Sequence, residues 1–260
     1  AAQTVQADYG DNYETASRPM TGLELYSAIA KIGYTFSPGS RIELLTVGGV
    51  EDHEYYRVPA AGRIDYRTEK ENAFVGLRYD HTTDGPFRWD VGMTYNDFHE
   101  NRINLTSGQS ERNRPQDATK LFANLTHDHA LGEDWRWSAA HGVLYAEDMF
   151  SDITNTPRRF EFGEKSAYTR HSLVWNDTVT LNLGLRGAEI DNAFRTIDQW
   201  AHNAGVAVQV PTVGKIHVSH SSGYRLNKAF YLWWGGGNNV ARDPAVGLDP
   251  SESETLEIGW

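Results

Sequence analysis

The sequence predicts an all-β fold, namely an antiparallel transmembrane β-barrel in which about eleven meander strands form part of a larger barrel. Segments of about ten residues alternate between apolar and polar side chains, which is the length and pattern of a strand that crosses a bilayer. Short turns and long polar connections alternate along the chain. Aromatic residues make up 12% of the 260 residues, and no apolar run is long enough for a membrane-spanning helix.

Residues 1–22 are polar and irregular and are predicted to form a loop or tail, whereas residues 23–260 form the partial barrel. The first hairpin joins 27–36 to 41–50 through Ser37-Pro38-Gly39-Ser40, whose residue types favour a tight turn. The other predicted strands are 72–80, 87–96, 119–127, 135–145, 165–175, 179–187, 202–210, 216–224 and the last residues of the chain. Short turns are predicted at 81–86, 128–134, 176–178 and 211–215, and long outer loops at 51–71, 97–117, 146–164 and 188–201.

The two faces of these strands differ in chemistry. The aromatic residues beside the short turns are in phase with the apolar face, as expected for the girdle at a membrane boundary: Tyr34, Phe36, Tyr79, Phe87, Trp89, Trp135, Trp137 and Trp175. The opposite face carries Lys31, Arg41, Glu43, Arg78, Asp80, Arg88, Asp90, Lys120, Asn124, Arg136, Asn182 and Arg186. So many charges would be costly in a dry core. We therefore expect a wide barrel with a water-filled or plug-filled interior, rather than a soluble β-sandwich.

Charge and composition exclude several kinds of partner. The net charge of -11 argues against nucleic acid. The absence of Cys excludes disulfides and thiolate zinc sites. His127-Asp128-His129 falls in a predicted short turn without further ligands nearby in sequence, so we interpret it as a solvated turn and predict no metal site and no cofactor.

Catalytic chemistry is not predicted. His217, Ser219, His220, Ser221 and Ser222 supply the residue types of a Ser–His pair, but residues two apart on one strand point outward in parallel and seldom meet. The sequence also lacks a Gly-x-Ser-x-Gly elbow. We therefore predict that the chain is not an enzyme and name no catalytic residues.

The outer loops are the predicted ligand-binding regions. The first long loop carries Tyr55, Tyr56, Arg57, Tyr66 and Arg67, and the aromatic loop near the end carries Trp233 and Trp234. Aromatic and guanidinium groups can bind an anionic, planar chelate by stacking and bidentate hydrogen bonds. The alternative for each residue is ordinary loop packing or contact with lipopolysaccharide.

The last forty residues contain a recognisable order of motifs. Ser221-Ser222-Gly223-Tyr224-Arg225 ends one strand, an aromatic loop follows, and Gly247-Leu248-Asp249-Pro250-Ser251-Glu252-Ser253 precedes a strand with Glu257-Ile258-Gly259. This order resembles the barrel of TonB-dependent outer-membrane receptors. The matching motif residues are Gly223, Tyr224, Arg225, Leu248, Pro250, Glu257 and Gly259. Leu226-Asn227 replaces the Ala-Pro that usually follows the Arg, and Ser251 stands where Glu is common.

The resemblance implies a barrel of about 22 strands with an N-terminal plug. It also implies location in the outer membrane of a Gram-negative bacterium, import of a scarce ligand such as an iron–siderophore complex, and contact with the TonB complex through an N-terminal region absent from this sequence. We expect the chain to be an internal piece of such a barrel, although the alternating Leu256, Ile258 and Trp260 would also suit a natural C-terminal strand. Expected partners are the lipid bilayer, lipopolysaccharide and the small-molecule ligand.

Two alternatives remain open at this point: a passive porin-like channel and, with less support, a membrane-barrel enzyme. No residue pattern identifies the ligand.

Overall fold

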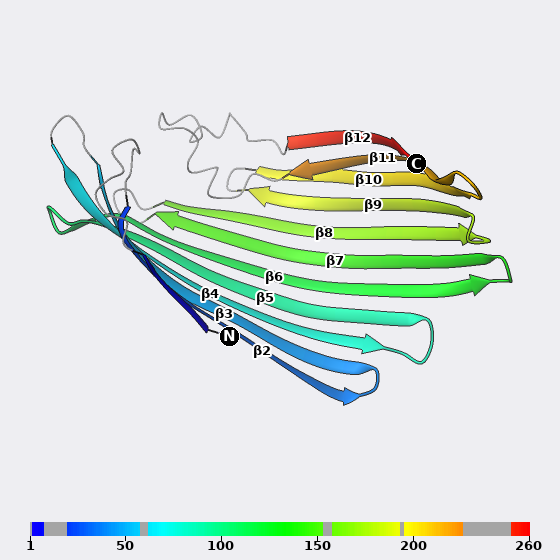
Figure 1. The fold of residues 1–260 in the computed structure, drawn as a ribbon, viewed down its shortest axis with the longest axis horizontal. Helices are drawn as coiled ribbons and strands as arrows, with labels where there is room; N and C mark the ends of the chain where they lie inside the picture. Colours follow the sequence, from blue (N-terminus) through cyan, green and yellow to red (C-terminus); the bar gives the residue numbers. More distant parts are fainter. Residues whose placement is uncertain (1, 8–19, 58–61, 153–157, 193–194, 226–250) are drawn as a thin grey trace.

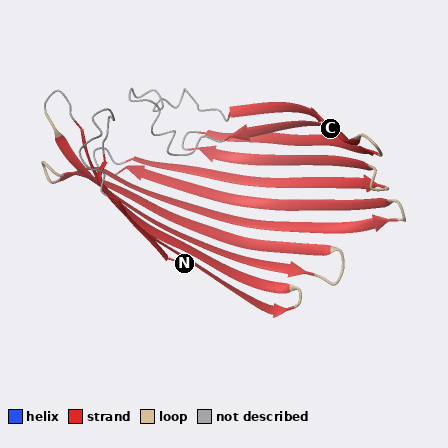
Figure 2. Cartoon of the chain, in the orientation of Figure 1, coloured by secondary structure: helices blue, strands red, loops and turns tan. Residues whose placement is uncertain are grey.

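The fold is a single twisted antiparallel sheet of twelve strands, seen in a computed structural model that describes residues 2–7, 20–57, 62–152, 158–192, 195–225 and 251–260 (Figures 1 and 2). Each strand pairs with the next along the chain, so the spatial order β1 to β12 is the sequence order. This is the predicted meander. The described residues contain no helix with the length and hydropathy needed to cross a membrane.

The strands are β1 (Ala2–Ala7), β2 (Met20–Ser37), β3 (Ser40–Arg57), β4 (Ile64–Thr82), β5 (Phe87–Asn104), β6 (Gln109–Leu131), β7 (Trp135–Asp152), β8 (Arg158–Trp175), β9 (Val179–Asn192), β10 (Arg195–Val210), β11 (Gly214–Arg225) and β12 (Ser251–Gly259). Strand β1 lies in the segment 1–22, for which the sequence analysis expects a loop or tail, and it pairs with residues 23–28 of β2. It is an addition to the predicted set of about eleven strands.

Most of the predicted long loops are wrong, because their residues continue the strands. The segment 97–117 forms the parts of β5 and β6 that lie farthest from the short turns. The chain turns there only at Leu105–Gly108, with Gly108 at φ 69°. Likewise 51–71 belongs mainly to β3 and β4. At about 3.3 Å per residue, an 18-residue strand such as β7 is roughly 60 Å long, about twice the hydrocarbon thickness of a bilayer. Beyond the apolar region both faces of a hairpin are polar, so the sequence loses its alternation while the backbone pairing continues.

The apolar face of the sheet carries a band of exposed aliphatic side chains. We use this name for the face that presents Ile32, Leu44, Leu77, Met93, Leu121, Val143, Leu183, Val206, Val218 and Ile258. The predicted girdle residues lie on the same face beside the short turns, where neighbouring rings meet at centroid distances of 5.9 Å for Phe36–Tyr79 and 6.1 Å for Trp135–Trp175. Tyr26, Tyr95, Tyr145 and Trp200 form a second aromatic row at the far edge of the band. An aliphatic band between two aromatic rows is the pattern of a membrane-facing barrel surface.

Four of the five predicted short turns occur close to where the sequence places them: Pro38–Gly39, Thr83–Pro86, Asn176–Thr178 and Pro211–Val213. The turn predicted at 128–134 is shorter and contains only Gly132–Asp134, because β6 continues to Leu131. At the β8–β9 turn Asn176 and Asp177 have φ of 47° and 52°, and the amide of Thr178 donates to Trp175 O at 2.8 Å. Two successive left-handed residues match the twist of a hairpin.

Several aromatic rings on the opposite face lie over glycines of a neighbouring strand. A Cβ on Gly142 of β7 would overlap the ring of Tyr168 in β8, and a Cβ on Gly92 would lie 2.5 Å from the ring of Phe122 in β6. The Tyr168 hydroxyl then reaches Asn124 Oδ1 at 3.0 Å. Because glycine has no side chain, Gly142 and Gly92 leave the space in which these rings pack against the sheet.

Replacing Gly142 by Ala should reduce the free energy of unfolding of the complete protein in detergent micelles by about 1–3 kcal/mol, because the Tyr168 ring must move and its bond to Asn124 is lost. Chemical denaturation followed by tryptophan fluorescence measures this. Gly48→Ala is the matched control, since the new Cβ would meet only Asn72 O at 3.8 Å. Equal effects of the two substitutions would contradict the packing argument.

Asn176→Ala should destabilise the β8–β9 hairpin by about 1 kcal/mol, because a left-handed backbone is unfavourable for Ala. Asn176→Gly should be neutral or stabilising, since glycine adopts this conformation without strain. The same denaturation experiment distinguishes the two variants, and an Ala variant as stable as the Gly variant would argue against the turn geometry.

Candidate functional site

The polar face carries a network of ion pairs that spans several strands near the short turns. Lys31 Nζ lies 2.7 Å from Glu43 Oε1, and Arg41 Nη2 lies 3.1 Å from Glu43 Oε2. Arg78 Nη2 lies 2.7 Å from Asp80 and 3.6 Å from Asp90. Asn124 donates to Asp90 Oδ2 at 3.0 Å, which extends the network to β6. The charges predicted to share one face therefore do so, and six of them form ion pairs on β2 to β5: Lys31, Arg41, Glu43, Arg78, Asp80 and Asp90.

A second cluster on the polar face lies at the far ends of β3, β4 and β5, close to the turns of the long hairpins. Tyr55 and Tyr66 face each other across β3 and β4 and stack at 5.3 Å with an interplanar angle of 22°. The guanidinium of Arg102 lies 5.2 Å from the centre of the Tyr66 ring, and its Nη1 donates to Tyr55 Oη at 3.4 Å. We call Tyr55, Tyr66 and Arg102 the Tyr–Arg cluster.

The side chains of the Tyr–Arg cluster are largely buried. Tyr55 and Tyr66 are 6% and 4% exposed, and the Arg102 side chain is 11% exposed. Arg102 Nη2 also bonds to Glu111 Oε2 at 3.3 Å, while its Nε is buried without a hydrogen-bond partner among the described residues. A guanidinium donor without an acceptor is costly to bury, so this position favours an added anionic or carbonyl oxygen.

The surroundings of the Tyr–Arg cluster are closely balanced in charge. Glu51 Oε1 accepts from Lys70 Nζ at 2.6 Å and lies 3.1 Å from His53 Nδ1. Burial lowers the pKa of His53, and the charge of Lys70 lowers this pKa further although Glu51 opposes both. The imidazole is therefore neutral at neutral pH, and Arg102 supplies the positive charge in contact with the stacked tyrosines.

The structure does not bring the predicted ligand residues into one site. Tyr55 and Tyr66 belong to the Tyr–Arg cluster, whereas Tyr56 and Arg67 lie on the opposite face of the same hairpin. Arg67 is held by Asp52, with Nε–Oδ2 at 2.9 Å, and lies 3.3 Å from Glu69; Tyr56 lies 4.3 Å from the guanidinium of Arg63. Arg57 ends β3. Trp233 and Trp234 lie outside the described residues.

Arg102 is the residue that sequence reasoning missed. It falls in the segment 97–117, for which the sequence analysis predicts a loop. A loop has no strand register that would place Arg102 beside Tyr55 and Tyr66. The pairing of β4 with β5 sets Tyr66 opposite Asn104 and Thr68 opposite Arg102. Residues 97–104 are mostly polar on both faces, so no alternation marks them as a strand, and only the strand pairing places Arg102 near Tyr66.

The motif residues near the end of the chain have local structural roles. Tyr224 is the last residue but one of β11, and the guanidinium of Arg186 lies 5.5 Å from its ring centre. Glu257 Oε1 lies 3.2 Å from His217 Nε2 across β11 and β12, and a Cβ on Gly259 would overlap the His217 ring. Gly223 and Arg225 pair with Ser253 and Ser251. Leu248 and Pro250 lie outside the described residues. In the Glu-x-Gly motif, Glu257 thus contacts the His217 imidazole and Gly259 leaves room for its ring.

The His127-Asp128-His129 segment is not a turn, contrary to the sequence-based interpretation. It lies within β6, and its two imidazoles face the apolar side with Trp137, His141 and His171. A hydrogen-bonded chain runs from Trp137 Nε1 to His171 Nδ1 (3.3 Å), from His171 Nε2 to Thr169 Oγ1 (2.9 Å), from Thr169 to His141 Nδ1 (2.9 Å) and from His141 Nε2 to His127 Nε2 (3.3 Å). The indole nitrogen of Trp137 can only donate a hydrogen bond. Its direction therefore determines which atom is the donor in each later hydrogen bond of this chain.

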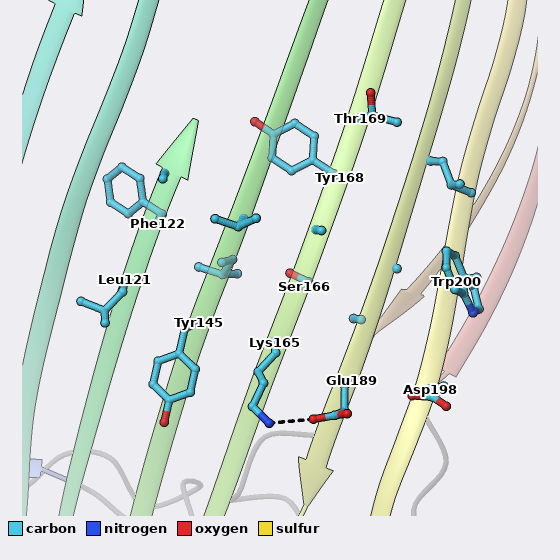
Figure 3. A pocket seen from close by; sticks show the side chains of 17 residues that line it. Leu121, Phe122, Tyr145, Lys165, Ser166, Tyr168, Thr169, Glu189, Asp198 and Trp200 are labelled. Atoms are coloured by element: carbon cyan, nitrogen blue, oxygen red, sulfur yellow. Dashed lines mark hydrogen bonds and ion pairs between the residues drawn. The ribbon is translucent and has the colours of Figure 1, made fainter. Parts of the chain in front are cut away.

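A shallow trough of about 1020 Å³ lies on the apolar face over β6 to β10 (Figure 3). Its floor is a row of small residues brought opposite one another by strand pairing: Ala123, Val143, Ala167 and Gly187. Leu121, Tyr145 and Trp200 form its sides, and Lys165 and Glu189 form an ion pair at its rim at 2.7 Å. The trough is therefore on the face opposite the Tyr–Arg cluster and is separate from it.

Comparison with known proteins identifies the family. The family model described as TonB dependent receptor-like, beta-barrel, matches residues 6–260. No curated protein sequence matches the chain.

Solved structures share the fold at low sequence identity. The ferric-catecholate import receptor Fiu from E. coli K12 has a TM-score of 0.72 and 11% identity over 99% of this chain and 50% of Fiu. The siderophore receptor PiuA from Acinetobacter baumannii has a TM-score of 0.68 and 13% identity over 99% of this chain and 49% of PiuA. The hemophore receptor HasR of Serratia marcescens has a TM-score of 0.66 and 11% identity over 88% of this chain and 40% of HasR.

The chain thus spans half or less of the length of these receptors. The two-faced meander, the two aromatic rows and the match over residues 6–260 lead to one conclusion: the chain belongs to the β-barrel family of TonB-dependent receptors.

Proposed function

We propose that this chain forms part of an outer-membrane receptor that imports a scarce ligand, such as an iron–siderophore complex, into a Gram-negative bacterium. The observation that carries the proposal is the family membership of residues 6–260 together with a sheet that is apolar on one face and ion-paired on the other. An aliphatic band between aromatic rows suits contact with lipid. The charged face suits a wet or plug-filled interior.

The proposed role is transport, with energy supplied from the inner membrane through the TonB complex. That contact would be made by an N-terminal region outside this sequence. The lipid bilayer and lipopolysaccharide are the proposed partners of the apolar face and of the hairpins beyond it. The net charge of -11 leaves nucleic acid an unsuitable partner.

The long hairpins are the proposed ligand-binding region. Tyr55, Tyr66 and Arg102 offer stacked rings, a guanidinium and a buried donor without an acceptor, a combination that suits an anionic group on a planar ligand. Tyr56, Arg57, Arg67, Trp233 and Trp234 remain candidates on the same predicted outer side. Similar proteins support this class of ligand by what their descriptions state: ferric catecholate for Fiu, a siderophore for PiuA and heme for HasR.

Energy coupling distinguishes the receptor from a passive channel. Uptake of radiolabelled ferric siderophores by cells that express the complete protein should stop when a protonophore dissipates the proton gradient. Uptake should also stop when the TonB gene is deleted. A passive channel would continue to admit small solutes under both conditions, and that result would contradict the proposal.

Arg102→Ala should weaken binding of the transported ligand by about 10- to 100-fold, which corresponds to loss of one or two charge-assisted hydrogen bonds. Titration of the purified complete protein by tryptophan fluorescence quenching measures the dissociation constant. Lys165→Gln is the control, since Lys165 lies on the apolar face and contacts Glu189. Arg102→Ala protein that folds and binds with unchanged affinity would exclude the Tyr–Arg cluster as the site without affecting the transport proposal.

A further inference from the structure

A Ser–His–His hydrogen-bonded chain lies on the apolar face where β10 meets β11. Regular pairing of these strands ends at Asn203 and Ser221, and His202 and Ser222 are the next residues along the two strands. Ser222 Oγ accepts a hydrogen bond from the backbone amide of His202 at 2.9 Å and lies 2.8 Å from His202 Nδ1. His202 Nε2 lies 3.1 Å from His220 Nδ1.

The direction of the protons follows from these contacts. A hydroxyl that already accepts the amide proton is free to donate its own proton, and His202 Nδ1 is the acceptor within reach. The proton of a neutral His202 then lies on Nε2 and is donated to His220 Nδ1. Ser222 is thus hydrogen-bonded to a base, and that base is oriented by a third side chain, which is the arrangement of an activated serine nucleophile.

The surroundings indicate which substrate could reach this serine. All three hydrogen bonds are exposed at the surface of the apolar face, beside Trp200 of the second aromatic row. His202 lies opposite Leu185 of β9, and His220 lies opposite Leu256 of β12, with Leu256 and the neighbouring Trp200 each 67% exposed. Glu254 of β12 pairs opposite Ser222 and is the carboxylate nearest in register on this face. An ester attached to an apolar chain fits these neighbours.

We propose that Ser222 is a nucleophile for acyl transfer from apolar esters, with His202 as its general base and His220 as a positioning residue. Ser222 Oγ bonds to the ester carbonyl carbon as its proton passes to His202 Nδ1. The carbon–oxygen bond to the alcohol breaks, His202 returns the proton to the departing oxygen, and the acyl group remains on Ser222. Water, deprotonated by the same nitrogen, then releases the carboxylic acid and restores the serine.

Sequence reasoning missed this arrangement because it sought partners along one strand. His217 and Ser219 lie on the polar face of β11, while His220 and Ser222 lie on the apolar face. The base comes instead from β10, and only the cross-strand register brings it to Ser222. The proposal does not depend on transport, since a receptor without this activity would still import its ligand.

Labelling with an alkyl fluorophosphonate tests the proposal, because such a probe forms an oxygen–phosphorus bond to an activated serine with loss of fluoride. The complete protein in detergent micelles should be labelled at Ser222, as located by peptide mass spectrometry. Ser222→Ala should abolish this label, and His202→Gln should slow labelling by about 100-fold or more. Ser221→Ala is the matched control and should be labelled at the wild-type rate, since Ser221 is the adjacent residue on the opposite face.

His220→Gln should reduce the labelling rate less than His202→Gln and should shift the pH at which the rate is half-maximal, which a purely structural role would not do. Heat-modifiable gel mobility verifies that each variant is folded. Folded wild-type protein that is not labelled at Ser222, or labelling of Ser222 at an unchanged rate in His202→Gln, would overturn the proposal.

Discussion

The structure depends on the pairing of every strand with the next one through backbone hydrogen bonds. In a bilayer an amide or carbonyl group without a partner cannot turn to water, so a membrane-spanning sheet must satisfy these groups between its strands. Antiparallel pairing from β1 to β12 does this in sequence order. Because side chains alternate strictly on each strand, the same pairing also separates the aliphatic band from the ion-paired face. The register thus fixes both the backbone bonding and the chemistry of each surface.

The spanning parts of the strands could be predicted because one face meets lipid and the other meets water. Residues 87–96 alternate from Phe87 to Asn96, and the structure keeps this pattern in β5. Turn residues such as Pro38 and Asn176 also identified their turns, since few residue types accept those backbone angles. The outer halves of the hairpins could not be predicted in the same way. Glu100 and Arg112 pair across β5 and β6 at 2.8 Å, yet with polar residues on both faces no period marks them as strand.

The Tyr–Arg cluster and the Ser–His–His chain share a reason for escaping sequence analysis. Each joins residues from different strands: Arg102 meets Tyr55 from 47 residues away, and Ser222 meets His202 from 20 residues away. The sequence analysis named Tyr55 and Tyr66 of the first and Ser222 and His220 of the second, but it did not name Arg102 or His202, which come from other strands. Only the register of neighbouring strands decides which side chains come within hydrogen-bonding distance.

The chain of hydrogen bonds from Trp137 to His127 has a polarity that a single side chain imposes. Since the indole can only donate, His171, Thr169 and His141 each pass on a proton in the same direction, and the proton of His127 is left on Nδ1, where the described residues offer no acceptor. Five groups on three strands therefore behave as one oriented dipole lying along the membrane face. A residue that could both donate and accept in place of Trp137 would make the two orientations of this dipole interchangeable, and the surface would lose its fixed electrical direction.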